Sequence, residues 1–153
     1  MIPRPFSQAD ADSHYQRVEA VVMKRHQDLR MDPWVQRSWM RCVGDYALDP
    51  SKALTPRMLE PQELSRRIAA MGTCYSLAKA EIARLCESFD FAAGVSLTDA
   101  DGVILLYAGT SSFAGTARYS GFREGAVWSE AELGTNGMGT CLLTRSPIVV
   151  EAG

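Results

Sequence analysis

The residues of this chain most able to do chemistry lie close together at 128–142, in the stretch WSEAELGTNGMGTCL. A glycine-rich loop that leads into a helix can bind phosphate through its backbone N–H groups. A Walker loop also needs a lysine after its glycines, and residues 134–140 contain no lysine. Gly137 and Gly139 form a GxG pair without the third glycine or the preceding strand of a dinucleotide-binding motif. The stretch therefore gives weak support to nucleotide binding.

The same stretch holds two residues that could take part in catalysis. The Cys141 thiolate would be favoured at a helix N-terminus, but a catalytic cysteine needs a histidine base, and no histidine follows His26. Cys141 also fits a small buried apolar residue. Glu130 could act as a general base, or it could cap a helix and bind the backbone of residues 134–136. We find no catalytic constellation and do not expect an enzyme, and a thiol enzyme using Cys141 is the less favoured alternative.

The glycines themselves allow two backbone segments to approach closely, because they lack side chains. Thr135 and Asn136 can then turn their polar side chains onto backbone groups or toward a ligand. Two interpretations stay open. The stretch forms either the wall of a binding pocket or a tightly packed helix start.

Composition limits the classes of protein that fit. The chain has 153 residues, 46% of them apolar, and a net charge of −2, which fits one domain with or without an appendage and argues against a nucleic-acid surface in this segment. The four cysteines form no CxxC pair and lie far from both histidines, so we expect no metal site and no cofactor. No signal peptide and no membrane-spanning apolar run is present, and we expect a cytoplasmic protein with reduced thiols.

The first sixty residues form the first predicted region, and their pattern is helical. A helix is expected over 11–29, capped by Asp10 or Asp12. A second helix is expected from Pro33, with Asp32 as its N-cap, fading at Gly44. Residues 49–60 contain two prolines and no periodicity, which is typical of a connecting loop.

The second region, residues 61–89, is predicted to be one long helix with an unbroken heptad stripe. Apolar residues recur at alternating spacings of three and four, locally weakened at Gly72. Such a stripe indicates a helix that pairs with its copy in a homodimer, or one that packs on its own domain. The candidate dimerisation residues are Leu64, Ile68, Met71, Tyr75, Ile82 and Leu85.

The third region, residues 90–153, switches to a strand pattern. Residues 91–98 and 103–107 are predicted to form a β-hairpin around the turn 99–102, where Gly102 would take a positive φ. A short extended piece is expected at 125–128, a short helix at 136–144 and another strand from Pro147. Because the chain stops in that strand, we expect a fragment of a longer protein whose last strands are missing.

Two motifs in this order resemble one known family. The first is Arg37-Ser38-Trp39-x-Arg41-Cys42 followed by Leu48-Asp49-Pro50. The second is Gly125-Ala126-Val127-Trp128-Ser129-Glu130 followed by Gly134-Thr135-Asn136-Gly137-x-Gly139-Thr140. Together they are similar to the N-terminal sensory GAF domain, with its preceding helices, of acetoin-catabolism-type activators. These are sigma-54-dependent or Fis-family bacterial transcription regulators, and the resemblance covers about residues 30–153.

The resemblance implies an α/β (α+β) fold with N-terminal helices and a central antiparallel sheet of five or six strands. It implies a cytoplasmic, homodimeric sensor domain that binds a small organic effector and passes the signal through helices to a downstream module. That module would contain the DNA-binding helix-turn-helix, so this segment is expected neither to bind nucleic acid nor to contact a membrane. A ligand-free dimerisation or scaffold module of the same regulator is the alternative function.

The residues that could line an effector pocket are those that the hairpin and the glycine-rich stretch place near each other. An aromatic side chain beside a glycine-rich turn can cover a small ligand, which makes Trp128 the leading candidate. The candidate ligand-binding residues are Trp128, Glu130, Thr135, Asn136, Met138, Tyr107, Phe113 and Leu97.

Overall fold

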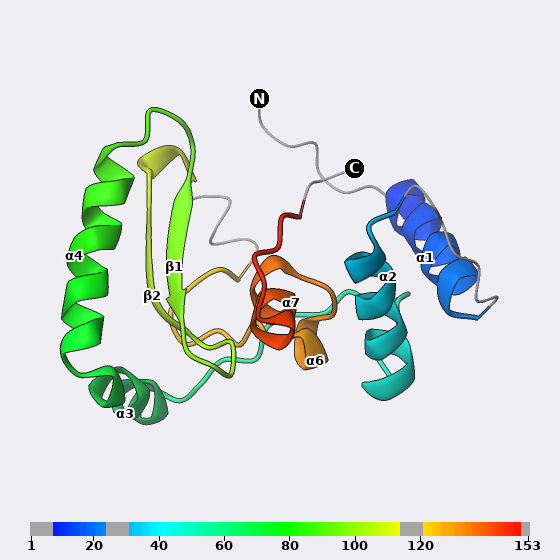
Figure 1. Ribbon diagram of the computed structural model, residues 1–153, viewed down its shortest axis with the longest axis horizontal. Coiled ribbons are helices and arrows are strands. Elements are labelled where there is room, and N and C mark those ends of the chain that lie inside the picture. The colour runs from blue at the N-terminus through cyan, green and yellow to red at the C-terminus, as the bar shows by residue number, and fades with distance from the viewer. Residues whose placement is uncertain (1–7, 24–30, 114–120, 151–153) are drawn as a thin grey trace.

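The structure is a computed structural model that describes residues 8–23, 31–113 and 121–150 (Figure 1). It is a mixed α/β fold in which helices lie on both sides of a small antiparallel sheet, and the two N-terminal helices lie at the end opposite to α4 (Thr73–Glu87). Within the described residues, no helix has the length and apolar character needed to cross a membrane.

The N-terminal part consists of α1 (Gln8–Val22), α2 (Pro33–Met40) and a π-helical turn, η1 (Arg41–Asp45), that continues α2. The capping prediction for Asp10 and Asp12 is wrong, because α1 begins before both residues. The predicted C-terminal part of that helix falls at 24–30, outside the described residues. Asp32 does take the N-cap position and Pro33 the first turn, although the Asp32 side chain makes no capping hydrogen bond.

The two N-terminal helices share an apolar cluster of their own. Val18 and Val21 from α1 pack with Met31 and with Trp39 from α2, and all four are buried. The His14 ring meets the Trp39 ring edge-on, with centroids 5.3 Å apart. The two helices therefore pack against each other through their own side chains and Met31, without any residue of the sheet.

The predicted long helix at 61–89 is two helices, α3 (Pro61–Met71) and α4. They meet at Gly72, whose φ of 55° and ψ of −134° end one helix and begin the next. A side chain at this φ would be strained, so the glycine that seemed only to weaken a helix breaks it.

The heptad stripe survives this break, but it faces the sheet of its own chain. A second apolar cluster contains Val103, Leu105 and Val127, all buried, and its helical neighbours include Leu64, Ile68, Met71 and Tyr75. Ile82 of α4 is also buried. This packing within one chain competes with pairing across a homodimer, which stays a prediction.

The sheet is built on the predicted hairpin, formed by β1 (Gly94–Thr98) and β2 (Ile104–Gly109). The turn forms as expected: the Asp99 carboxylate accepts the backbone N–H groups of Asp101 and Val103, both at 3.0 Å, and Gly102 has a φ of 81°. These local bonds place the chain reversal in the sequence position that the pattern indicated.

The extended piece at 125–128 lies between β2 and residues 57–59. The Ile104 N–H donates to the Ala126 carbonyl at 2.9 Å, and the Val127 N–H donates to the Arg57 carbonyl at 2.9 Å. Over the described residues the sheet has two strands and two isolated bridges, not the five or six strands that the resemblance implies. The strand predicted from Pro147 is also wrong, because residues 147–150 pair with no described strand and an extended segment becomes a strand only by pairing.

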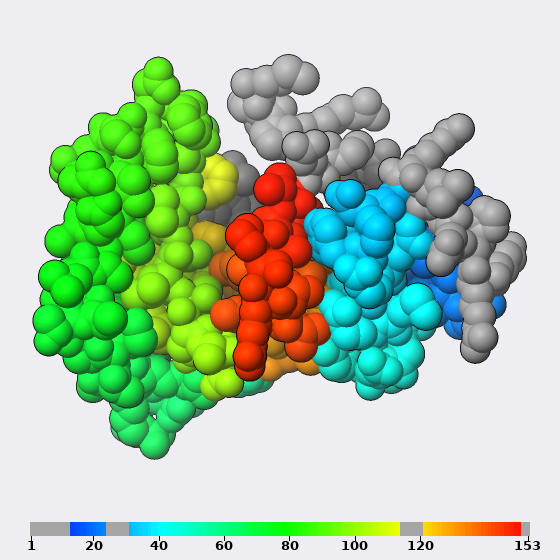
Figure 2. All heavy atoms as spheres, viewed as in Figure 1, coloured from blue at the N-terminus to red at the C-terminus, as the bar shows by residue number. Residues whose placement is uncertain are grey.

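The glycine-rich stretch forms α6 (Glu130–Leu133) and α7 (Gly137–Thr144), which lie between the sheet and α2 (Figures 1 and 2). Asn136 caps α7: its side-chain oxygen accepts the N–H groups of Met138 at 3.1 Å and Gly139 at 2.7 Å. The predicted helix is confirmed, and its cap fixes the start of α7 directly after Thr135.

Candidate functional site

Glu130 is the centre of the most developed polar cluster in the described residues. Arg41 donates from Nε to Glu130 Oε1 at 2.8 Å and from Nη2 to Oε2 at 3.1 Å. Oε2 also accepts the hydroxyl of Ser38 at 2.7 Å and that of Thr140 at 2.6 Å. The Glu130 residue is only 3% exposed. We call Ser38, Arg41, Glu130 and Thr140 the Glu130 clamp.

The clamp joins the two motifs that the sequence places far apart. Ser38 and Arg41 belong to the first motif, and Glu130 and Thr140 to the second. The Thr135 hydroxyl lies 2.7 Å from the Ser38 hydroxyl, and because Ser38 donates its proton to Glu130, Thr135 is the donor in this contact. Glu130 binds the backbone of residues 134–136 through its main-chain carbonyl, which accepts the Gly134 N–H at 2.9 Å, whereas its side chain binds Arg41, Ser38 and Thr140.

The electrostatics of the clamp favour a charged carboxylate. Burial alone would raise the pKa of Glu130, but the hydrogen bonds from Arg41, Ser38 and Thr140 outweigh it, and the pKa is lowered. The hydrogen bond to Glu130 in turn raises the pKa of Arg41, against the opposing effect of burial. Burial raises the pKa of the neighbouring Cys42 thiol. A carboxylate held ionised by four donors is suited to positioning elements and poorly suited to accepting a proton as a general base.

The lowered pKa of Glu130 gives the clamp a defined pH dependence. A carboxyl group whose pKa is lower in the folded than in the unfolded state stabilises the fold fully above the unfolded value, about 4.3. This contribution is lost as the pH falls through the folded pKa. We expect the urea midpoint of the native protein to fall more steeply below about pH 4.3 than that of Glu130→Gln. Parallel midpoint curves for the two proteins would contradict this assignment.

Gly139 explains why the glycine-rich stretch needs a residue without a side chain. A Cβ placed there would overlap the Glu130 nitrogen at the start of α6 and would lie 2.7 Å from the Trp128 carbonyl oxygen and the Ser129 carbonyl carbon just before it. At Gly137 the nearest atom to such a Cβ would be Val150 Cγ2, at 3.8 Å. Of the two interpretations left open by the sequence, a tightly packed helix start is the one that the contacts support at Gly139.

Three predicted ligand-binding residues do come together, in an aromatic cluster that also contains Phe122. The Tyr107 and Phe122 rings are edge-to-face with centroids 5.4 Å apart, and Phe122 and Trp128 are 5.3 Å apart. A Cβ at Gly94 would lie 2.8 Å from Phe113 and 3.0 Å from Tyr107, so these two rings cover that glycine. We call Tyr107, Phe113, Phe122 and Trp128 the aromatic cluster.

The Tyr107 hydroxyl is the unusual atom of the aromatic cluster. It is buried and has no hydrogen-bond partner, alone among the buried side-chain polar atoms of the described residues. Burial raises the pKa of this tyrosine, so it carries a neutral hydroxyl. An unpaired buried polar group costs about 1–3 kcal/mol, which a polar atom brought by a ligand would offset.

The remaining predicted residues lie nearby but in other roles. Met138 accepts a hydrogen bond from Ser96 of β1 at its sulfur, at 3.5 Å, and links α7 to the sheet. Leu97 is half-buried in β1 and pairs with Leu106 across the hairpin. Cys141 comes after the first turn of α7, so it does not lie beside the free N–H groups of the helix N-terminus, where its thiolate was predicted to be favoured.

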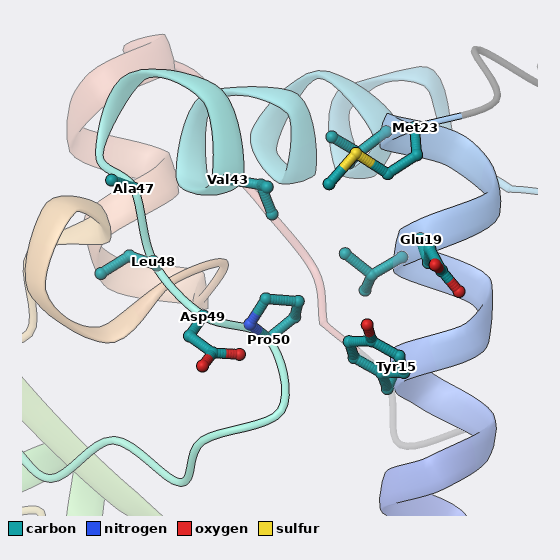
Figure 3. Close-up of a pocket in the computed structure, with 10 residues that line it drawn as sticks. Tyr15, Glu19, Met23, Val43, Ala47, Leu48, Asp49 and Pro50 are labelled. Atoms are coloured by element: carbon teal, nitrogen blue, oxygen red, sulfur yellow. The ribbon is translucent and has the colours of Figure 1, made fainter.

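Two hollows of the described surface have linings that include no residue of the aromatic cluster. One of about 360 Å³ opens between α1 and residues 43–50, and its lining includes Tyr15, Met23, Val43, Leu48 and Pro50 (Figure 3). A second, of about 330 Å³, is lined by Tyr46, Ala100, Ser129, Glu130 and Leu142, among others. Glu130 alone of the predicted ligand-binding residues lines either of these two hollows.

Four residues of these clusters were absent from the predicted site: Ser38, Arg41, Phe122 and Thr140. Ser38, Arg41 and Thr140 belong to the two recognised motifs, and this was the sequence feature that could have marked them as site residues. Nothing in the spacing indicated that the motifs bind each other. Phe122 lies in a glycine- and serine-rich stretch whose local pattern suggests a loop.

Comparison with known proteins identifies relatives among bacterial regulators. The chain is 34% identical over 124 residues to the acetoin catabolism regulatory protein of Cupriavidus necator, an alignment of 78% of this chain and 18% of that protein. It is 27% identical over 125 residues to the acetoin dehydrogenase operon transcriptional activator AcoR of Bacillus subtilis, over 81% of this chain and 20% of the activator. An uncharacterized 47.3 kDa protein of Rhodococcus erythropolis is 34% identical over 110 residues, 71% of this chain and 24% of that protein.

No protein-family profile and no solved structure matches the chain. The chain spans about a fifth of the length of the curated relatives it matches. Most of its own length aligns with them, including a regulator from each of two bacterial species. The chain is therefore a relative of one segment of the acetoin-catabolism-type transcriptional regulators.

Proposed function

We propose that this chain is the effector-sensing segment of a bacterial transcription regulator. A small organic effector would bind at the aromatic cluster and change how the N-terminal helices are held, and a DNA-binding module elsewhere in the regulator would respond through a homodimer. The relationship to acetoin regulators supports the regulatory role. The observation that carries the sensing role is the unpaired buried hydroxyl of Tyr107, whose ring packs edge-on against Phe122 in the aromatic cluster.

The chemistry of the aromatic cluster favours a small neutral effector. Its four side chains offer apolar surface, one hydroxyl and the Trp128 indole N–H, which donates to the Gly121 carbonyl at 3.4 Å, and none of them is charged. Acetoin, which appears in the names of the relatives, has this chemistry: two methyl groups, a carbonyl oxygen that can accept from Tyr107 and a hydroxyl group. The sensing proposal therefore takes acetoin as its first probe.

Replacing Tyr107 with phenylalanine is expected to separate binding from folding. The variant should bind acetoin about tenfold more weakly, because one hydrogen bond is lost. Its ligand-free fold should be as stable as the native one or up to about 1 kcal/mol more stable, because the unpaired hydroxyl is gone. Isothermal titration calorimetry and urea unfolding measure the two effects.

Tyr75→Phe is the matched control, because Tyr75 packs on the cluster of Val103 and Leu105 and its ring is not part of the aromatic cluster. It should leave acetoin affinity unchanged. If native protein binds neither acetoin nor other small ketones, alcohols and aromatic acids in a thermal-shift screen, the sensing role is excluded.

The second candidate is a ligand-free scaffold that only positions the output module. The close packing of Gly139 against α6 favours it, because it gives the glycine-rich stretch a purely structural purpose. Trp128→Ala and Met138→Ala distinguish the two functions. Loss of effector response with an intact fold supports the sensor, whereas loss of folding alone supports the scaffold.

A further inference from the structure

The Glu130 clamp is the principal polar link between the N-terminal helices and the rest of the described fold. The apolar cluster of α1 and α2 contains Val18, Val21, Met31 and Trp39, and the sheet cluster contains none of these residues. Ser38 and Arg41 reach from α2 and η1 to Glu130, 92 and 89 residues away in the chain. A buried carboxylate with a defined set of donors thus supplies the central polar contact between the two parts, beside the contacts of Ser38 and Cys42 with Thr135.

The same carboxylate is mechanically tied to the aromatic cluster. Trp128 contributes its ring to the cluster and is two residues before Glu130. Gly139 lies against the backbone of both, since a Cβ there would overlap the Trp128 carbonyl and the Glu130 N–H. Because Gly139 of α7 is packed directly against the backbone of residues 128–130, a displacement of Trp128 is expected to shift the start of α6 and the Glu130 side chain with it.

The clamp tolerates little displacement of Glu130. Its four hydrogen bonds are 2.6–3.1 Å long, and such bonds weaken steeply when geometry is lost. A buried carboxylate without its partners costs several kcal/mol. Partial displacement of Glu130 is therefore disfavoured, which leaves two arrangements to compare: Glu130 fully bound to Ser38 and Arg41, or the clamp open and α2 released. A bistable element of this kind is what an allosteric signal requires.

We propose that the Glu130 clamp is the switch that couples the aromatic cluster to the N-terminal helices. Movement of Trp128 opens the clamp, and α1 and α2 are released together. The physiological use of this switch rests on the proposed sensing function, but the coupling between Trp128 and Arg41 exists without any effector and can be measured in its absence.

The test is a mutant cycle read by hydrogen exchange of the α1 and α2 amides in the 153-residue chain. Glu130→Gln alone is expected to raise their exchange rates about tenfold or more, because the charge that holds Arg41 is gone. Trp128→Ala alone should raise them as well. In the double variant, Trp128→Ala should add almost nothing, because the clamp that transmits its effect is already open.

Glu132→Gln is the matched control in the same helix. Glu132 also receives two hydrogen bonds from one arginine, Arg57, at 2.8 and 3.2 Å, but on the surface. It should leave the exchange of α1 and α2 unchanged and should not alter the effect of Trp128→Ala. Trp128→Phe replaces Trp128→Ala if the alanine variant does not fold.

The outcomes separate the coupling from the sensing function. If the exchange rate of the double variant rises by the product of the two single effects, the coupling between Trp128 and Glu130 is overturned, whether or not an effector binds. An unchanged exchange rate in Glu130→Gln would overturn it as well. Absence of acetoin binding with a non-additive cycle would leave the coupling in place and remove only the proposed effector. Acetoin binding with an additive cycle would retain the sensor and reject the clamp as its relay.

Discussion

Arg41→Met is expected to destabilise the protein by about 3 kcal/mol, because it leaves the Glu130 carboxylate buried without its cation. The Glu130 side chain is 2% exposed, whereas that of Arg41 is 24% exposed. Because Arg41 is partly exposed, the expected loss of stability is at the lower end of the range for a broken buried ion pair. Urea unfolding followed by circular dichroism measures it.

Two controls identify the cause of this loss. Arg57→Met removes the partner of Glu132, and that pair has side chains 58% and 35% exposed, so it should cost less than about 1 kcal/mol. In the double variant Arg41→Met/Glu130→Gln, an uncharged amide replaces the carboxylate, so no unpaired charge is buried. It should be less destabilised than the sum of the single variants. A purely additive result would show that the pairing contributes nothing.

Gly139→Ala is expected to have the second large effect, a loss of about 2–3 kcal/mol. In an ordinary helix the same change gains up to about 1 kcal/mol, because glycine is the more flexible residue. Here the added Cβ would meet the backbone of Trp128, Ser129 and Glu130, and backbone cannot rotate away as a side chain can. The α7 helix would have to move off α6, as in other overpacked sites.

Gly137→Ala tests the same substitution in the same helix without the obstruction. The nearest atom to its Cβ would be 3.8 Å away, so this variant should be neutral or slightly more stable. Thermal unfolding of both variants distinguishes the effects. If both alanine variants had equal stability, the close approach of α7 to α6 would be refuted.

The parts of the fold that the sequence predicted are those specified by neighbouring residues. The turn at Asp99–Gly102, the first turn at Pro33 and the cap at Asn136 each depend on contacts a few residues apart. Residue types at these positions carry the signal because the chemistry is local. The hairpin and the short helix of the glycine-rich stretch were therefore predictable.

The failures concern contacts between distant residues. A heptad stripe has the same spacing whether the helix is continuous or broken. The helix ends at Gly72 because residues of both α3 and α4 pack against the sheet cluster, a contact that the local sequence does not reveal. Glu130 could have bound local backbone groups as readily as Ser38 and Arg41. The residues next to Glu130 in the sequence do not indicate which groups its carboxylate binds, because that depends on how α2 approaches α6.

Helix α2 has consequences for how the N-terminal part can move. Its adjacent residues Ser38 and Trp39 are both buried, Ser38 against Glu130 and Trp39 in the cluster with α1. Successive residues in a helix point about 100° apart, so α2 makes buried contacts on two of its sides. Rotation of α2 about its own axis would break the contacts of Ser38 and of Trp39 together, whereas tilting or sliding can break one and keep the other. A tilting or sliding motion that frees Ser38 and keeps Trp39 in its cluster would therefore move α1 and α2 together as one rigid unit.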